Sequence, residues 1–229
     1  MASREPEIHG DNAPDFSEVQ RIFAENFTKR GELGASVCIW HRGVKVVDLW
    51  AGHVDLARTT PWCEDTMSTI FSSTKGLVAL CFLILSDRGE FSYDDTVAQY
   101  WPEFAANGKE SISIRTLLNH RAGLIGIDSA FTLDTLRNNP ERVAEFAGAQ
   151  APQWEPGQVQ GYHGVTYGIY AAELFQRIAG ESLGAFLDRE VRKRLNADVF
   201  LGLPADEEAR VSDIFPVSGS DRLFKILPR

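Results

Sequence analysis

Several features that would assign this chain to a specialised class of protein are missing from its sequence. No run of 18 apolar residues is present, so we expect no transmembrane helix. Residues 1–14 are polar and lack the apolar core of a secretory signal, so we expect a cytoplasmic protein. The net charge is −9, with acidic and basic residues interleaved, which argues against binding to nucleic acid or to a membrane.

Residues that form disulfides or bind metals are also scarce. The three cysteines, Cys38, Cys63 and Cys81, are odd in number and widely spaced, so we interpret them as small buried apolar residues. The five histidines show no spacing typical of metal ligands. Apolar residues make up 44% and charged residues 24% of the 229 residues, as in an ordinary globular protein. We therefore predict one large or two small globular domains with neither a disulfide framework nor a metal site.

The segments that favour β structure gather in the first third of the chain. Apolar residues at helical spacing predict a helix over residues 15–30. Two β-rich runs, 35–40 and 44–50, surround a glycine-containing turn and predict an antiparallel hairpin. A short strand is expected at 69–71. This is too little sheet for a self-contained layer, so we expect the hairpin edge to need a cover or a partner.

Short helices alternate with loops after residue 89. The shorter predicted helices cover residues 96–100, 114–119, 133–138 and 141–147. A longer amphipathic helix is predicted over 162–179, where Gly180 ends it. Ser182 then caps a further helix that reaches residue 195.

One motif places a serine and a lysine three residues apart. Ser72 and Lys75 share a helix face at this spacing, so Lys75 can lie beside the Ser72 hydroxyl. A serine holds its proton at neutral pH, and a lysine that is kept partly neutral can accept that proton. The 15 Ser and 6 Lys of the chain would produce this spacing about 0.4 times in random order, so the motif alone is weak.

The residues that follow the motif give it more weight. Residues 77–85 carry no charge and predict a helix that is buried on all sides. The first turn of that helix would point its N–H groups at Ser72. The alternative interpretation is that Ser72 only caps the helix and that Lys75 is solvated.

A second candidate group lies in Gly161-Tyr162-His163-Gly164, which follows a turn-rich loop at 152–157. We expect Tyr162 at the start of a helix, where its phenol could share a proton with Lys75 and a leaving group. The alternative is a half-buried aromatic residue whose hydroxyl finds an unrelated partner.

Together these residues resemble the serine β-lactamase-related superfamily, which includes class C β-lactamases and penicillin-binding proteins. Residues 71–75 match its nucleophile motif, and residues 117–124 resemble its Leu-Leu-x-His-x-(Ser/Ala)-Gly-Leu segment. Pro156-Gly157 followed by Tyr162 resembles its tyrosine motif, in the same order and at a similar separation. Within the superfamily, the chain is most similar to the family VIII carboxylesterases, also called the EstB-like esterases.

The resemblance implies an α+β fold, an α/β sandwich of the β-lactamase/transpeptidase type with a largely helical inserted region. We divide the chain into residues 1–88, an α/β part with the hairpin and the nucleophile helix, and residues 89–211, a mainly helical part with the tyrosine motif. Residues 212–229 form a tail of unclear structure. Members of the superfamily are longer, and their last third supplies further strands and a second oxyanion donor. The chain therefore resembles their N-terminal half, with an incomplete sheet.

By resemblance, Ser72 is the acylated nucleophile of a serine hydrolase that acts on small carboxylic esters. Lys75 and Tyr162 are its proton-transfer partners, and the backbone N–H of Ser72 is one oxyanion donor. No metal or organic cofactor is implied.

The resemblance also implies that His120, His163 and Gly164 bind the substrate. A β-lactamase of the nearest class usually has Asn where this chain has Gly164. Losing that amide removes a donor to the acyl-amide group of the substrate, which favours esterase over efficient β-lactamase activity.

Other functions stay open at this point. The chain could be a catalytically silent protein that binds or scaffolds, and β-lactamase or D-amino-acid peptidase activity is a less favoured reading. We expect the chain alone to be a weak catalyst that forms a homo-oligomer or needs a complementing C-terminal chain. A tail that docks as a strand would favour a working fold.

Overall fold

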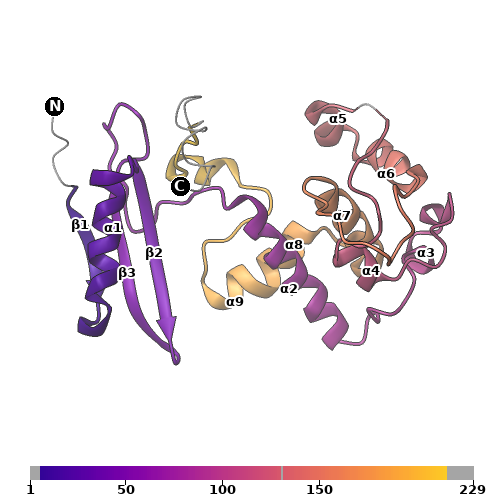
Figure 1. Ribbon diagram of the computed structural model, residues 1–229, viewed down its shortest axis with the longest axis horizontal. Helices are drawn as coiled ribbons and strands as arrows, with labels where there is room; N and C mark the ends of the chain where they lie inside the picture. The colour runs from indigo at the N-terminus through magenta and orange to yellow at the C-terminus, as the bar shows by residue number, and fades with distance from the viewer. Residues whose placement is uncertain (1–5, 130, 216–229) are drawn as a thin grey trace. The chain divides into compact units, whose positions relative to one another are not determined.

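The computed structural model describes residues 6–129 and 131–215, and the chain forms two compact units (Figure 1). The first, here called the sheet unit, comprises Met1–Thr69 with Leu203–Arg229. The second, here called the helical unit, comprises Ile70–Gly202. Each unit has its own hydrophobic core.

The boundary between the units differs from the division expected at residue 88. The helix that follows Ser72 belongs to the helical unit, because its buried face packs against helices from later in the chain. The prediction of a docked tail concerns residues 212–229, of which 216–229 lie outside the described residues.

The sheet unit contains a three-stranded antiparallel sheet in the order β1-β3-β2. The hairpin is confirmed as β2 (Gly34–His41) and β3 (Val44–Gly52), with a register shift between Ile39 and Trp40. The predicted first helix is confirmed as α1 (Ser17–Lys29), which lies along one face of the strands in Figure 1. The buried side chains between helix and sheet are Phe23, Phe27, Val47, Leu49 and Ala51. Within the part of the chain that the structure describes, the sheet has three strands and is incomplete, as expected.

The strand β1 (Ile8–Asn12) was not predicted from the sequence. Its residues are mostly polar and exposed, so they lack the alternation that marks a half-buried strand. Gly10 has a φ of +90°, and a Cβ atom there would lie 1.9 Å from the carbonyl oxygen of Asp48. The strand forms because β3 offers an unpaired edge and because glycine allows this close approach.

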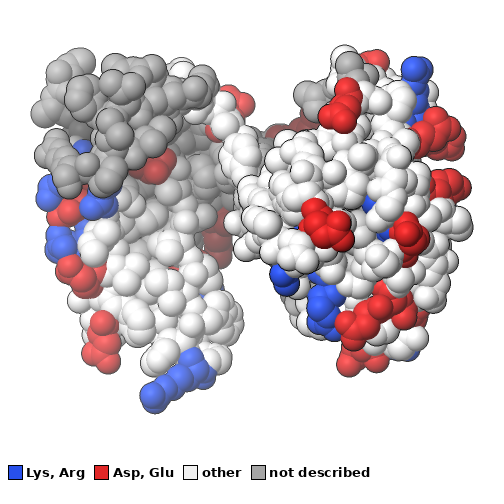
Figure 2. Space-filling model, turned by 45° about the vertical axis from the view of Figure 1, so that its right-hand side comes forward, with Lys and Arg blue, Asp and Glu red and all other residues white. Residues whose placement is uncertain are grey.

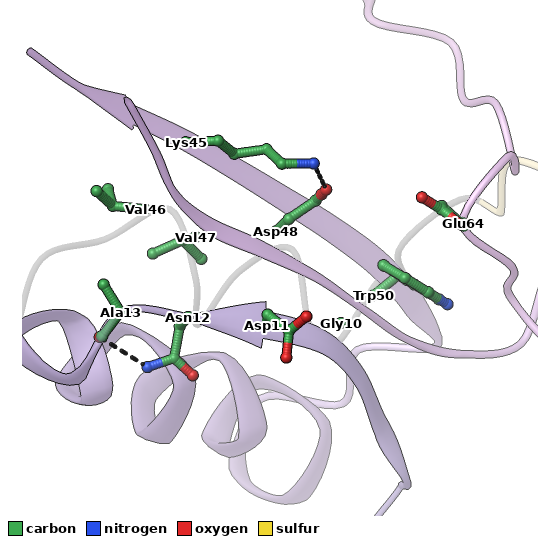
Figure 3. A pocket seen from close by; sticks show the side chains of 10 residues that line it. All are labelled: Gly10, Asp11, Asn12, Ala13, Lys45, Val46, Val47, Asp48, Trp50 and Glu64. Atoms are coloured by element: carbon green, nitrogen blue, oxygen red, sulfur yellow. Dashed lines mark hydrogen bonds and ion pairs between the residues drawn. The ribbon is translucent and has the colours of Figure 1, made fainter. Parts of the chain in front are cut away.

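A pocket lined by both polar and apolar residues lies beside β1 and β3 (Figure 3). Its volume is about 210 Å³. Lys45 and Asp48 form an ion pair in it, and Asn12 Nδ2 donates to the Ala13 carbonyl at 3.1 Å. None of the predicted site residues lines this pocket.

In the helical unit, the residues after Ser72 form α2 (Thr74–Asp87), but the helix is not buried on all sides as we expected. Leu80 is 37% and Leu83 56% exposed. Its buried face packs against α7 (Thr166–Ala179) and α8 (Leu183–Leu187). These two helices cover only one side of α2, and an uncharged sequence by itself does not say how many sides find partners.

Two further expectations are wrong. Residues 69–71 are not a strand: Phe71, with a φ of +45°, begins a 3₁₀ turn over Phe71–Ser73. Of the three cysteines only Cys81 is buried, whereas Cys38 and Cys63 are exposed. Cys38 lies on β2 between the two less exposed residues Val37 and Ile39, so the strand alternation turns it to the other face.

The remaining helices follow the predicted pattern closely. They are α3 (Val97–Tyr100), α4 (Ile114–Leu118), α5 (Leu133–Asn138) and α6 (Pro140–Ala149), then α7 and α8, a π-helical turn (Asp188–Arg192) and α9 (Lys193–Leu195). Gly180 ends α7 with a φ of +71°, and Ser182 Oγ accepts the N–H of Ala185 at the start of α8, as predicted. However, α7 begins at Thr166, so Tyr162 lies in the loop before the helix.

Among the residues that the structure describes, no helix combines the length and apolar character that crossing a membrane requires. Within that same part of the chain, no three His, Cys, Asp or Glu side chains form a group that could hold a metal ion. Acidic and basic side chains are interspersed on the face shown in Figure 2.

Candidate active site

The candidate nucleophile lies in a strained turn at the head of α2. Phe71, the residue before Ser72, is in the left-handed region, which costs free energy for a residue that has a side chain. The N-cap residue of α2 is Ser73 and not Ser72, and the Ser73 side chain makes no capping hydrogen bond among the described residues. The backbone N–H of Ser72 donates to no group among the described residues. Ser72 as a whole residue is exposed in this turn.

The Ser72 hydroxyl oxygen contacts two other polar side chains. Lys75 Nζ donates to Ser72 Oγ at 3.1 Å, and Tyr162 Oη donates to the same oxygen at 2.7 Å. All three residues belong to the helical unit. The alternatives in which Ser72 is a simple cap, Lys75 is solvated and Tyr162 has an unrelated partner do not describe this arrangement.

Lys75 is held by further groups besides Ser72. Its ammonium donates to the carbonyl oxygen of Gly164 at 2.9 Å. It also lies 5.0 Å from the ring centre of Tyr162 and 5.7 Å from that of Tyr167. Aromatic faces attract a cation at such distances. Lys75 is thus held close to the Tyr162 phenol.

Tyr162 is 60% exposed, and its phenol reaches Ser72 from the loop before α7. The hydrogen bond with Ser72, and then the hydrogen bond and positive charge of Lys75, lower the pKa of the Tyr162 phenol below its ordinary value of 10. These contacts favour the ionised form, which could accept a proton from Ser72. Neutral, the phenol can donate that proton to a leaving group.

Gly164 and His163 occupy quite different surroundings. Gly164 is exposed and meets Lys75 through its backbone carbonyl. The His163 side chain is buried, and its Nε2 accepts the backbone N–H of Leu124 at 3.0 Å. Direct contact between His163 and a substrate, which the resemblance implied, does not fit this burial.

His120 lies next to His163 and is only partly buried. Its Nδ1 atom accepts the backbone N–H of His163 at 3.1 Å and lies 3.3 Å from His163 Nδ1. Burial, and then the charge of Lys75, lower the pKa of His120 below 6.5. Burial, followed by the neighbouring His120, lowers the pKa of His163 to about 4.

Sequence reasoning did not find two features of this site. Tyr167 contributes a ring face to the surroundings of Lys75, and the Gly164 carbonyl accepts a hydrogen bond from it. For Tyr167, the sequence offered only the general amphipathic pattern of α7. The Gly164 carbonyl is a backbone group, and a motif defined by side-chain types does not reveal the role of a backbone group.

An apolar hollow of about 370 Å³ lies elsewhere on the helical unit. It is lined by residues of α5, α6 and α7, together with Val165, the residue just before α7. Neither Ser72, Lys75 nor Tyr162 lines it.

Comparison with known proteins gives consistent results. The family model described as Beta-lactamase matches residues 19–226. The protein "Esterase/beta-lactamase LipL" of Mycobacterium tuberculosis is 35% identical over 214 residues, which cover 90% of this chain and 48% of that protein. The chain spans about half the length of the curated relatives it matches.

Two solved structures show the same fold over most of this chain. A family VIII carboxylesterase matches with a TM-score of 0.87 and 40% identity, covering 95% of this chain and 60% of that one. A penicillin-binding protein homolog from Caulobacter crescentus matches with a TM-score of 0.87 and 36% identity, covering 92% of this chain and 56% of that one. The fold is thus of the β-lactamase/transpeptidase type.

Proposed function

The chain belongs to the beta-lactamase family, and we propose that it carries the nucleophile of a serine hydrolase that cleaves carboxylic esters through an acyl-enzyme on Ser72. The observation that carries the proposal is the contact of three groups: Ser72 Oγ lies 3.1 Å from Lys75 Nζ and 2.7 Å from Tyr162 Oη. A relative with "esterase" in its name and a family VIII carboxylesterase of the same fold support an ester substrate.

In the proposed acylation step, ionised Tyr162 takes the proton of the Ser72 hydroxyl as Ser72 Oγ attacks the ester carbonyl carbon. The carbonyl π electrons move to the oxygen, and the Ser72 backbone N–H stabilises the resulting oxyanion. One such donor is worth about 3–4 kcal/mol in related chemistry. The tetrahedral intermediate collapses, the bond to the alcohol oxygen breaks, and Tyr162 returns its proton to the departing alkoxide.

The proposed deacylation step runs through the same groups. Tyr162 takes a proton from a water molecule, whose oxygen attacks the acyl carbon. The bond to Ser72 Oγ breaks, and Ser72 recovers its proton from Tyr162, leaving a carboxylic acid. Lys75 stays charged in both steps and stabilises the ionised phenol, to which it lies close.

The lack of a side chain at Gly164 favours esters over amides as substrates. It has no side chain that could donate to an acyl-amide group, and its backbone carbonyl is occupied by Lys75. β-Lactam hydrolysis is the second candidate, because a 35% identical relative is named both esterase and β-lactamase. We expect p-nitrophenyl butyrate to be turned over faster than nitrocefin, and the reverse order would favour the second candidate.

The direct test is intact-mass analysis after exposure to a fluorophosphonate, with peptide mapping of the labelled residue. We expect one adduct on Ser72 that the Ser72→Ala variant lacks. Ser73→Ala is the matched control, since Ser73 is the adjacent exposed serine, whereas the hydrogen bonds of Lys75 and Tyr162 go to Ser72 Oγ. Labelling that survives in Ser72→Ala contradicts the assignment. A folded wild-type chain that takes no label supports the catalytically silent alternative.

A further inference from the structure

The two histidines beside the candidate site have interlocking hydrogen bonds. His163 is 1% exposed, and its Nε2 atom accepts the backbone N–H of Leu124. A backbone N–H can only donate, so this ring nitrogen carries no proton. His163 is therefore neutral, with its proton on Nδ1.

The bonds of His120 lead to the opposite tautomer. Its Nδ1 atom accepts the backbone N–H of His163 at 3.1 Å and faces the Nδ1–H of that ring at 3.3 Å. The carbonyl of Gly161 is a second acceptor close to the His163 ring. Because N–H donors point at His120 Nδ1, this nitrogen must be unprotonated, with its lone pair available as the acceptor. His120 is then neutral, with its proton on Nε2.

The histidine pair is tied to the peptide that joins Tyr162 to His163. The His163 N–H belongs to that peptide, and His120 holds it in place. The His120 ring also packs against the rings of Tyr162 and Tyr167, with centres 5.1 and 5.0 Å away. Because Tyr162 is 60% exposed, few other contacts can hold its phenol against Ser72.

We propose that His120, locked in its neutral form by His163, is a positioning residue that holds the Tyr162 phenol at Ser72, and that protonation of His120 releases it. A second proton on His120 would sit on Nδ1, where it would face the N–H groups of His163 in place of a lone pair. The hydrogen bond to the Tyr162–His163 peptide would then be lost.

Two features of its surroundings oppose the protonation of His120. Burial of the ring opposes protonation, and the charge of Lys75 on α2 opposes it further. The phenols of Tyr162 and Tyr167 lie against the His120 ring, and His163 completes its surroundings. Among the described residues, the groups that act on the charge of His120 and His163 include no carboxylate, which would favour the charged form.

The first experiment reads the tautomers and does not depend on catalysis. Nitrogen-15 NMR of the imidazoles at pH 7 should show His163 protonated on Nδ1 and His120 on Nε2. A charged His120 at pH 7, or one protonated on Nδ1, would overturn the proposal. This measurement needs no turnover, so its result does not depend on the proposed esterase function. Only the catalytic experiment on His120 rests on that function.

The second experiment compares two variants of His120. In His120→Asn, the side-chain oxygen can replace Nδ1 as acceptor, and asparagine tolerates the φ of +61° found at this residue. His120→Leu removes the acceptor. Hydrogen exchange of the His163 amide should stay slow in the first variant and become fast in the second, whether or not the chain is active. Equal protection in both variants would contradict the proposal.

The catalytic readout is the rate of fluorophosphonate labelling at Ser72. We expect His120→Asn to keep the rate at pH 8 within about threefold and His120→Leu to lose more than about tenfold. As the pH falls, two protonations should lower the wild-type labelling rate, one at Tyr162 and one at His120. In His120→Asn only the protonation of Tyr162 should lower the rate. Identical pH profiles, or a His120→Leu variant that labels normally, would refute the positioning role.

Discussion

Tyr162 and Ser72 are 90 residues apart in the chain, yet their hydroxyl oxygens lie 2.7 Å from each other. The contact joins a loop in front of one helix to a strained turn at the head of another. Lys75 lies close to both residues: its Nζ is 3.1 Å from Ser72 Oγ and 5.0 Å from the centre of the Tyr162 ring.

Removing the Tyr162 hydroxyl should stop the chemistry and leave the fold intact. We expect Tyr162→Phe to lower the rate of Ser72 labelling by about 10²–10⁴-fold, since proton transfer by a positioned group contributes that much. Thermal unfolding should hardly change, because the ring is largely exposed. The control is Tyr167→Phe, which keeps a ring beside Lys75 and should label within about threefold of wild type. Equal losses in the two variants would argue against a proton-transfer role for Tyr162.

The pH dependence of labelling should follow the ionisation of Tyr162. Ser72 and Lys75 lower its pKa, so the reactive phenolate should form, and the rate should rise, at a pH below the ordinary tyrosine value of 10. In Lys75→Ala the midpoint should move to higher pH, and activity should fall out of proportion to stability. The measurement is the labelling rate from pH 6 to 10, with ultraviolet difference titration of the phenol. An unchanged midpoint in Lys75→Ala would show that Lys75 does not tune the phenol.

Burial of neutral His163 should make the helical unit sensitive to acid. Its pKa is about 4 in the fold, against 6.5 for an ordinary histidine, so the unfolded chain binds more protons between these values. Above pH 6.5 the titration of His163 takes nothing from the free energy of unfolding, and as the pH drops to 4 it lowers that free energy by about 3 kcal/mol. His163→Gln can keep an acceptor for the Leu124 N–H and does not titrate, so its unfolding free energy should fall less over this range. Parallel curves for the two proteins in urea unfolding would contradict this account.

A glycine just before Tyr162 should be intolerant of a side chain. A Cβ atom on Gly161 would lie 2.3 Å from the Trp154 ring, so Gly161→Ala must move either the ring or the loop. We expect it to destabilise the protein by about 1–3 kcal/mol, as overpacking does, and to slow labelling at Ser72.

Gly168→Ala is the matched control for that variant. Gly168 lies within α7, and a Cβ atom there would meet nothing within 4 Å. We expect this substitution to stabilise the protein by about 0.5–1 kcal/mol, because alanine loses less backbone entropy in a helix. Thermal unfolding of the two variants side by side checks both expectations, and destabilisation by Gly168→Ala would show that the α7 surface is covered.

Lys109 should matter for stability and not for the site. It is fully buried, and its ammonium donates to the carbonyl oxygens of Ala106, Gly148 and Gln150. Lys109→Met would leave these acceptors without a donor, at a cost of about 1–3 kcal/mol. Labelling of the folded fraction at Ser72 should be normal. The control is Lys193→Met. The Lys193 side chain is 65% exposed, so this substitution should change the free energy of unfolding by less than about 0.5 kcal/mol.

Much of the fold could be predicted because local patterns decided it. Apolar spacing marked α1, the hairpin and α7, and Gly180 and Ser182 marked where helices end and begin. The pattern failed where a neighbour decides the conformation. Strand β1 has a polar sequence and is held by β3. Residues 77–85 of α2 carry no charge, although one side of that helix is exposed.

For the site, the sequence by itself determined the contact between Ser72 and Lys75, since three residues along a helical turn bring two side chains to the same face. Only the tertiary structure decided that Tyr162 reaches the same oxygen and that His120 holds the peptide behind it. These contacts join segments about 40 and 90 residues apart in the chain. No local spacing specifies them, because they depend on how α2, α7 and the loops between them pack around a shared core.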